Sequence, residues 1–313
     1  MLRLRPAQYA ISGLLLATLA WGLSLVVTRG AVESYPLVGF LFLRFAVGAL
    51  ALGGVALCSA RARRTWRSVP KARLLMLGLI LAFAYLAQTV GLYLGASPGV
   101  AAALTSLVVV MTPLIEWALQ RRTPGLGIWF GAFMALGGSL LVCLAVPAQI
   151  QGARSHELLG LLLEVGSAAG FSVQVVLVGR LGNRVPPVLL GAWQLLALAL
   201  VLGLALPFSG GLPAPTPQVA LAVVFCGLAA SAFAFAVQAA AQRRISSSMA
   251  ALIMAVEPGV ALVAGAAAGM EALTPLALLG VAVLFGGSSV EAWGSFLRRL
   301  WRRLGAEPPW QRA

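Results

Sequence analysis

Apolar segments of bilayer-spanning length follow one another along almost the whole chain, and short polar or Pro/Gly-rich stretches separate them. A helix that crosses the hydrocarbon core of a bilayer needs about 20 mostly apolar residues, and the segments match this length. A β-barrel would need alternating strands of roughly ten residues, whereas residues 195–206 are apolar without alternation. The pattern therefore predicts an all-α integral membrane protein.

We predict ten transmembrane helices, five in each half of the chain. In the first half they span residues 8–27, 36–57, 74–94, 100–119 and 126–146. In the second half they span residues 158–178, 188–206, 219–240, 249–268 and 273–290. Two five-helix repeats, residues 1–147 and 156–293, are followed by a basic cytoplasmic tail, residues 294–313. Hydrophobic residues make up 61% of the chain, which is typical of membrane proteins and not of soluble domains.

Basic residues are concentrated in every second connection between the predicted helices. They are Arg3 and Arg5, then Arg61, Arg63, Arg64, Arg67, Lys71 and Arg73, then Arg121 and Arg122, Arg180 and Arg184, Arg243 and Arg244, and finally Arg298, Arg299, Arg302, Arg303 and Arg312. The other connections hold only Arg29 and Arg154. By the positive-inside rule, both termini are predicted to lie in the cytoplasm. Anionic lipid headgroups account for the net charge of +14, so we expect a lipid bilayer as partner and no nucleic acid.

The two halves share a residue pattern. Small residues, an apolar run and a mid-span proline occur around Pro113 and again around Pro258, at a shift of 145 residues. The strings GAFMALGG from Gly131 and GVAVLFGG from Gly280 share their glycine spacing, which we interpret as close helix packing. Five helices are an odd number, so the second copy enters the membrane from the opposite side and forms an inverted-topology repeat. Each proline removes a backbone hydrogen bond, and both are predicted to break their helices beside a central cavity.

The order and spacing of several strings resemble one family of transport proteins. These strings are LAWGLSLVVTR from Leu19, QTVGLYLG from Gln88, TSLVVVMTPL from Thr105 and AQRRISSSMAALIMAVEPG from Ala241. They are similar to the EamA-type ten-helix exporters of the drug/metabolite transporter superfamily. The resemblance implies a small-molecule permease of a prokaryotic cytoplasmic membrane that exports amino acids or related metabolites by alternating access between its halves.

The chain departs from the family pattern at some charged positions. Gln120, Arg121 and Arg122 stand where such proteins often carry a glutamate, and Glu116 and Glu164 match no family motif. We expect Glu116 to form a local ion pair with Arg121 or Arg122. Burial in a low dielectric favours the neutral form of a carboxyl group. Glu164, about two turns inside the sixth predicted helix, is therefore a candidate for coupling transport to protons.

An ionisable side chain in the middle of a membrane helix costs about 2.5 to 3.5 kcal/mol on insertion scales, so each one needs a role. Arg44 lies in the middle of the second predicted helix. It either binds a carboxylate of the solute or forms a structural pair with a glutamate or with carbonyl groups at a helix end. Glu257, beside Pro258, either supports the broken backbone, pairs with Arg44 or contacts the solute.

Aromatic and amide side chains from both halves are predicted to line a central cavity. They are Trp21, Tyr85, Gln88, Gln174, Trp193, Gln194 and Gln238. Gln194 occupies roughly the repeat position of Arg44, while an interfacial belt or plain packing is the alternative for the aromatic residues. A cationic group and an apolar wall together suit amino acids, whose export we predict. A multidrug exporter of hydrophobic cations is the alternative, with Glu164 as the counter-charge.

The residue types needed for catalysis or metal binding are scarce. The chain has no aspartate, no GxSxG string and a single histidine, His156, in a predicted loop. An aspartyl dyad, a serine nucleophile elbow and a zinc site are therefore not expected. We predict no enzyme activity, no cofactor and no metal. The inverted repeat favours a transporter over a channel or a non-transport membrane scaffold, with a small molecule as substrate, and a monomeric state is compatible with this interpretation.

Overall fold

The computed structural model describes residues 6–120, 124–145 and 155–287. Every regular element within these ranges is helical, which confirms the all-α class. Nine helical segments in the described part of the chain are long and apolar enough to cross a membrane. The tenth predicted span is described as the shorter apolar helix Pro275–Gly287. The end of that span and the basic tail at residues 294–313 lie outside the described residues.

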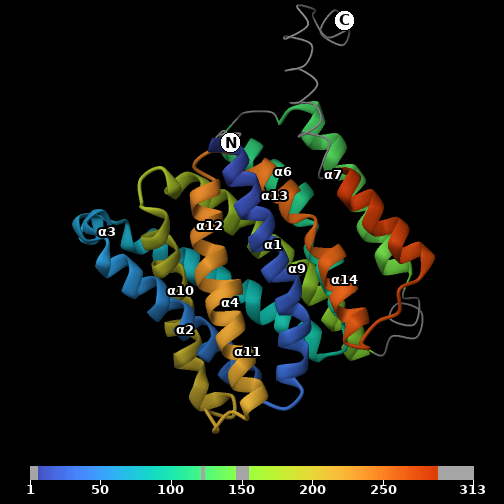
Figure 1. Ribbon diagram of the computed structural model, residues 1–313, viewed down its shortest axis with the longest axis horizontal. Coiled ribbons are helices and arrows are strands. Elements are labelled where there is room, and N and C mark those ends of the chain that lie inside the picture. The colour runs from blue at the N-terminus through green and yellow to red at the C-terminus, as the bar shows by residue number, and fades with distance from the viewer. Residues whose placement is uncertain (1–5, 121–123, 146–154, 288–313) are drawn as a thin grey trace, which may run out of the picture.

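The helices of the two halves follow one another in the same order (Figure 1). In the first half they are α1 (Pro6–Val32), α2 (Leu37–Cys58), the short α3 (Ala60–Thr65), α4 (Lys71–Tyr93), α5 (Pro98–Thr105), α6 (Val108–Gln120) and α7 (Leu126–Leu144). In the second half they are α9 (Ser155–Gly182), α10 (Pro187–Ala205) with the 3-10 turn Leu206–Phe208, α11 (Pro217–Gly227), the π segment Leu228–Phe233, α12 (Ala234–Ala241), α13 (Ser247–Met254), α14 (Glu257–Ala267) and Pro275–Gly287.

Two of the membrane-length spans are broken in the middle. Residues 98–119 form α5 and α6, and residues 247–267 form α13 and α14. The serines that precede α5 and α13, Ser97 and Ser246, each accept a hydrogen bond from the backbone amide three residues on, and they cap the two helices in the same way. The equivalent breaks are therefore 149 residues apart.

The two prolines do not occupy equivalent positions of the repeat, so the predicted alignment of the halves at a shift of 145 residues is wrong. Pro258 is the second residue of α14 and directly follows a break, but Pro113 lies inside α6. The first break falls at Ser106 and Leu107, where the Ser106 hydroxyl donates to the Ala103 carbonyl and competes with regular helix bonding. Pro113 has no amide hydrogen to donate to Val109, but α6 continues through it to Gln120.

The interior is formed mainly by contacts between the halves. Helix α2 packs on α10, α4 packs on α9, and α1 packs on α11 and α12. Exchanging the two halves leaves this set of contacts unchanged, because α1 corresponds to α9, α2 to α10, and α4 to α11 and α12. Figure 1 shows α1 lying between α12 and α14, both of which it contacts.

Helix α7 and helix Pro275–Gly287 cross with their backbones in contact. A Cβ atom on Gly131 would lie 2.7 Å from the Gly287 carbonyl oxygen, and one on Gly138 would lie 2.6 Å from that of Gly280. The reverse substitutions meet the same obstacles. The two helices are antiparallel at this crossing, and the predicted close packing of the paired glycines is confirmed.

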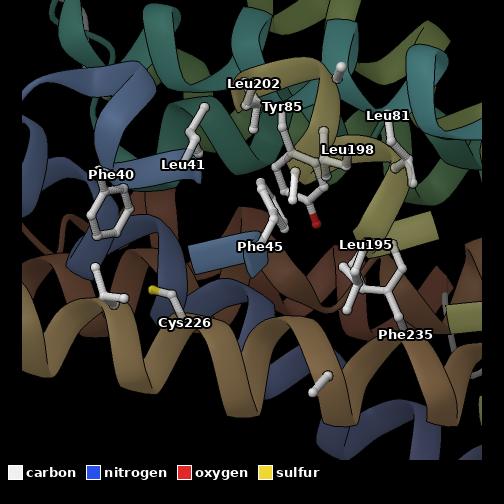
Figure 2. Packing of buried hydrophobic residues seen from close by; sticks show 14 of the residues in the cluster. Phe40, Leu41, Phe45, Leu81, Tyr85, Leu195, Leu198, Leu202, Cys226 and Phe235 are labelled. Carbon is white, nitrogen blue, oxygen red and sulfur yellow. The ribbon is translucent and has the colours of Figure 1, made fainter. Parts of the chain in front are cut away.

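The largest buried cluster lies where α2, α4 and α10 meet α11 and α12 (Figure 2). Phe45 and Tyr85 are at its centre, with ring centroids 4.7 Å apart. Aliphatic side chains such as Leu195 and Leu198 pack around them and are fully buried. This cluster forms one side of the functional site, because Tyr85 also faces the cavity described next.

Candidate functional site

A cavity lies where the two broken spans meet. Its wall includes residues on both sides of each break. They are Thr105, Ser106, Val108 and Val109 at the first break and Met254, Ala255 and Glu257 at the second. Helices α1, α4, α9 and α12 supply most of the remaining wall. Both halves of the chain therefore contribute to one cavity.

Most of the lining residues fall into pairs that are 149 or 150 residues apart. They are Trp21 and Phe171, Ser24 and Gln174, Leu25 and Val175, Tyr85 and Phe235, Gln88 and Gln238, Ala102 and Ala251, Thr105 and Met254, Ser106 and Ala255, and Val108 and Glu257. Equivalent positions of the two halves thus face the same space. The cavity lies on the pseudo-symmetry axis that relates the halves.

Four aromatic rings form the apolar part of the wall. Tyr85 lies between Phe171 and Phe235, with ring centroids 5.0 Å and 6.3 Å away. The indole N–H of Trp21 donates to the Ala230 carbonyl at 2.9 Å, and its ring meets Phe235 edge to face at 6.2 Å. The Ala230 carbonyl belongs to the π segment, where the Ala234 amide bonds to Ala229 instead. The wider turn thus positions the Trp21 ring.

Three buried glutamines form a hydrogen-bonded group. The Gln174 amide nitrogen donates to the side-chain oxygens of Gln194 at 3.0 Å and Gln238 at 3.1 Å, and Gln238 donates back to Gln174 at 3.2 Å. Gln174 and Gln238 line the cavity, and Gln194 is fully buried behind them. Trp193 is placed away from the cavity, where its ring packs against Trp66 at 5.2 Å.

Arg44 lies behind the cavity wall and is only 2% exposed. Its guanidinium group donates to three hydroxyl oxygens, those of Ser231 at 3.2 Å and of Thr28 and Ser24 at 3.4 Å each. It also lies 5.1 Å and 5.2 Å from the ring centroids of Phe45 and Tyr85. No glutamate in the described ranges comes within 4.0 Å of it, so the predicted ion pair with a glutamate is not formed. Arg44 instead ties α2 to α1 and to the π segment.

Glu257 supplies the carboxyl group of the cavity wall. It is the only ionisable acid or base among the described lining residues other than the phenol of Tyr85. It is also the first residue of α14 and precedes Pro258. A carboxylate in the first turn of a helix is stabilised by the positive end of the helix dipole. The carboxyl group of Glu257 therefore lies at the cavity surface without an ion-pair partner in the described part of the chain.

Glu164 is fully buried one layer behind the cavity. The Gln88 amide donates to the Thr105 hydroxyl at 3.3 Å, and this hydroxyl donates to Glu164 Oε2 at 3.3 Å. Glu164 Oε1 has no hydrogen-bond partner among the described residues. A Cβ atom on Gly91 would lie 2.5 Å from Oε1, so this glycine provides the space for the carboxyl group. Since Gln88 and Thr105 line the cavity, a short polar chain connects it to Glu164.

Two further glutamates bind backbone amides near the ends of the broken spans. Glu116 accepts from the backbone amide and the hydroxyl of Ser248, while its predicted partners Arg121 and Arg122 lie outside the described residues. Glu271 accepts from the Gly99 amide at 2.6 Å. Burial raises the pKa of the Glu271 carboxyl group, and the hydrogen bonds from Gly99 and Ser97 oppose this shift.

Sequence reasoning missed several lining residues. Phe171, Phe235 and Met254 look like ordinary apolar positions in membrane helices. Thr105 and Ser106 begin the string TSLVVVMTPL, but nothing in that string indicates that they face a cavity. The repeat itself was the available signal. At a shift of 150 residues, Phe171 is equivalent to Trp21 and Phe235 is equivalent to Tyr85. Trp21 and Tyr85 are both predicted cavity residues.

The fold and the cavity together define a polytopic membrane protein with a binding space between two similar halves. The model of the EamA-like transporter family matches residues 8–144 and again residues 158–290. The chain belongs to this family, which is part of the drug/metabolite transporter superfamily and indicates a membrane transporter of small solutes. The predicted resemblance is therefore confirmed.

A solved structure described as "Crystal structure of protein" shares the fold. It has a TM-score of 0.72 and 22% sequence identity, and the match covers 93% of this chain and 98% of that one. None of the curated protein sequences compared with the chain is similar to it. The match of both repeats thus establishes the family, and the solved structure establishes the fold. The kind of solute has to be inferred from the cavity.

Proposed function

We propose that this protein is a secondary transporter that exports amino acids or related metabolites across a prokaryotic inner membrane by alternating access. It has ten transmembrane helices in two inverted five-helix repeats, with both termini in the cytoplasm. Three observations support this arrangement. Basic residues concentrate in alternate connections, the contacts between helices are unchanged when the halves are exchanged, and both broken spans meet at a central cavity.

The composition of the cavity wall is the observation that carries the proposal. Glu257 offers a carboxylate to the ammonium group of an amino acid. The rings of Trp21, Phe171 and Phe235 offer an apolar surface to its side chain. The first turn of α6 begins at Val108 without an acidic residue, so the positive end of its helix dipole favours the carboxylate of the solute.

Arg44 has an indirect role in this proposal. Its guanidinium group is occupied by three hydroxyls and is not exposed to the cavity. It adds positive potential behind the wall formed by Ser24 and Tyr85, where a carboxylate would otherwise be poorly stabilised. Direct binding of a solute carboxylate to Arg44 would require the cavity to open further.

The test is flux of a panel of labelled amino acids in proteoliposomes, alongside hydrophobic cations. We expect saturable flux of amino acids with apolar side chains, and at least about a tenfold loss in Glu257→Gln, because a charge-assisted hydrogen bond is worth about 1.5 to 3 kcal/mol. Glu33→Gln is the matched control, since Glu33 lies just beyond the end of α1, is 58% exposed and pairs with Arg29. No amino-acid flux in protein that is folded and inserted would contradict the proposal.

A second candidate is export of hydrophobic cations. The presence of a carboxylate beside aromatic rings favours it, since both attract organic cations. The two candidates differ in their need for a solute carboxylate. Flux of an apolar amine equal to that of the matching amino acid would support the cation exporter, and preference for the amino acid would support the first candidate.

Glu164 is the proposed coupling residue. Its unpartnered oxygen and its connection to the cavity through Thr105 provide a protonatable group that can respond to the bound solute. The proposal is that solute export is exchanged for proton entry at this group.

A further inference from the structure

The two broken spans are held together at both ends by a carboxylate of one half bound to a backbone amide of the other. At one end, Glu116, in the last turns of α6, accepts from the Ser248 amide at 3.1 Å and from the Ser248 hydroxyl. Ser248 is the second residue of α13. We call this contact the Glu116 clasp. It joins the first half to the second at the N-terminal end of α13.

The opposite end has a contact of the same kind with the halves exchanged. Glu271, just beyond α14, accepts from the amide of Gly99 at 2.6 Å, and Gly99 is the second residue of α5. We call this contact the Glu271 clasp. Ser248 and Gly99 are 149 residues apart, as equivalent positions of the repeats are. Each clasp thus binds the same amide of equivalent helices.

The carboxylates come from different positions but reach equivalent places. The residue 149 positions after Glu116 is Gly265, and a Cβ atom there would lie 2.7 Å from Glu271 Oε1. Glu271 therefore folds back over the space that a side chain at position 265 would fill. A Cβ atom on Gly99 would also lie 2.5 Å from Glu271 Oε2. The equivalence is one of geometry, and it is not visible as a repeated glutamate in the sequence.

Each half-helix leads from the cavity to one clasp. Helix α5 begins at the Glu271 clasp and ends at Thr105 in the cavity wall, and α13 begins at the Glu116 clasp and ends at Met254. Eight helical residues are about 12 Å long, so both clasps are about two turns from the cavity wall. Both clasps are formed in this structure.

We propose that the Glu116 and Glu271 clasps are the two gates of the transporter, and that each opening of the cavity breaks one clasp while the other stays closed. This inference rests on the proposed alternating access, with the Glu116 clasp on the cytoplasmic side. The arginines at positions 121 and 122 follow Glu116 in the chain and place it at that face. Glu116 and Glu271 are positioning residues, because neither contacts the cavity.

The test measures from which side a single cysteine in the cavity can be labelled. Ser106→Cys is introduced into a full-length protein whose Cys58, Cys143 and Cys226 are replaced by alanine. A membrane-impermeant maleimide is then applied to inside-out and to right-side-out vesicles. We expect Glu116→Gln to raise the labelling rate from the cytoplasmic side at least about tenfold relative to the other side, because the hydrogen bonds from Ser248 lose their charged acceptor and become weaker. Glu271→Gln should shift the ratio the opposite way by a similar factor.

The double variant separates gating from simple damage. If the clasps bias one equilibrium, Glu116→Gln combined with Glu271→Gln should return the ratio of the two labelling rates to within about twofold of the parent. The control Glu33→Gln should leave the ratio unchanged. If the single variants have the same ratio of labelling rates as the parent, or if both shift it to the same side, the two clasps are not the gates. Since no solute is needed, failure of the amino-acid flux assay is a separate result.

Discussion

The two halves of the cavity wall occupy equivalent positions but differ in chemistry. The first half contributes hydroxyls and a phenol at places where the second contributes an amide, a thioether or a plain phenyl ring. The sharpest difference is at the helix that follows each break, which begins with Val108 in one half and with Glu257 in the other. The backbone repeat decides where the side chains point. The different residue types at equivalent positions give the two sides of the cavity different polarity.

The difference continues one layer behind the wall. Arg44 and Gln194 are 150 residues apart, and both are buried. Arg44 is held by hydroxyl groups and aromatic rings, whereas Gln194 exchanges hydrogen bonds with neutral amide and carbonyl groups. The first half therefore places a guanidinium group behind the wall, and the second places a carboxyl group on the wall. A symmetric fold thus surrounds the cavity with an asymmetric set of ionisable groups.

The largest effect is expected from making the second break resemble the first. Glu257→Val places in α14 the residue that begins α6 and removes the charge of the wall. We expect the initial rate of solute flux in proteoliposomes to fall about 100-fold, since a charged hydrogen bond of up to about 3 kcal/mol is lost. Val108→Ala, at the other break, should change the rate less than about twofold. Similar losses in both variants would show that the charge is not what matters.

Arg44→Gln makes the first half resemble the second. It leaves the hydroxyls of Ser24, Thr28 and Ser231 without their donor, so we expect a loss of about 2 kcal/mol in stability. The KM for the solute should change less than about twofold, because Arg44 does not face the cavity. Thermal unfolding in detergent and flux kinetics measure the two quantities, with the exposed Arg73→Gln as control. A tenfold higher KM at unchanged stability would identify Arg44 as a solute ligand instead.

Glu164 has no acidic counterpart, because the position 150 residues earlier is Leu14. Glu164→Gln should lower proton-gradient-driven accumulation by about tenfold, which is in the range of typical coupling free energies. Exchange of solute without a gradient should change less than twofold. Both rates are measured in the same vesicles, with Glu33→Gln as control. Retained dependence on the gradient in Glu164→Gln would remove this residue from the coupling step.

The smallest effect concerns the place where the halves are most alike. Gly138→Ala would put a methyl group 2.6 Å from the Gly280 carbonyl, while the neighbouring Gly137→Ala meets nothing within 4 Å. We expect Gly138→Ala to cost about 1 to 3 kcal/mol, as overpacking does, and to lower the melting temperature by a few degrees. Gly137→Ala should leave it unchanged or raise it slightly. Equal shifts in the two variants would mean that the crossing is not closely packed in solution.

The membrane-length helices could be predicted from the sequence because lipid leaves the chain few options. Every buried backbone group must be satisfied within its own helix, so composition and segment length suffice. The glycine pairs of α7 and helix Pro275–Gly287 were recognisable for a similar reason, since few other residues allow backbones to touch. Of the predicted site residues, Trp21, Tyr85, Gln88, Gln174 and Gln238 line the cavity.

The details of the site depend on contacts that no local pattern encodes. The break in the first half occurs at a serine that binds its own backbone, although the nearby Pro113 is the more conspicuous residue. The partners of Arg44 are hydroxyls from α1 and from the π segment, far apart in the sequence. The clasp of Glu271 depends on the absence of a side chain at Gly265. Each case requires knowledge of which helices meet.

The π segment Leu228–Phe233 gives the eighth span one residue more than a regular helix would use there. Its wider turn, in which the Ala234 amide bonds to Ala229, absorbs this residue and keeps the helix faces before and after it in register. Deleting one residue within the segment would shorten the 25-residue span by one and allow an ordinary helix that is still long enough to cross the membrane. Phe235 and Gln238 would stay on the face towards the cavity, but the Ala230 carbonyl would join the regular helix bonding and be taken from Trp21. A single codon lost at this point would thus release one indole ring of the site while leaving a well-formed membrane helix.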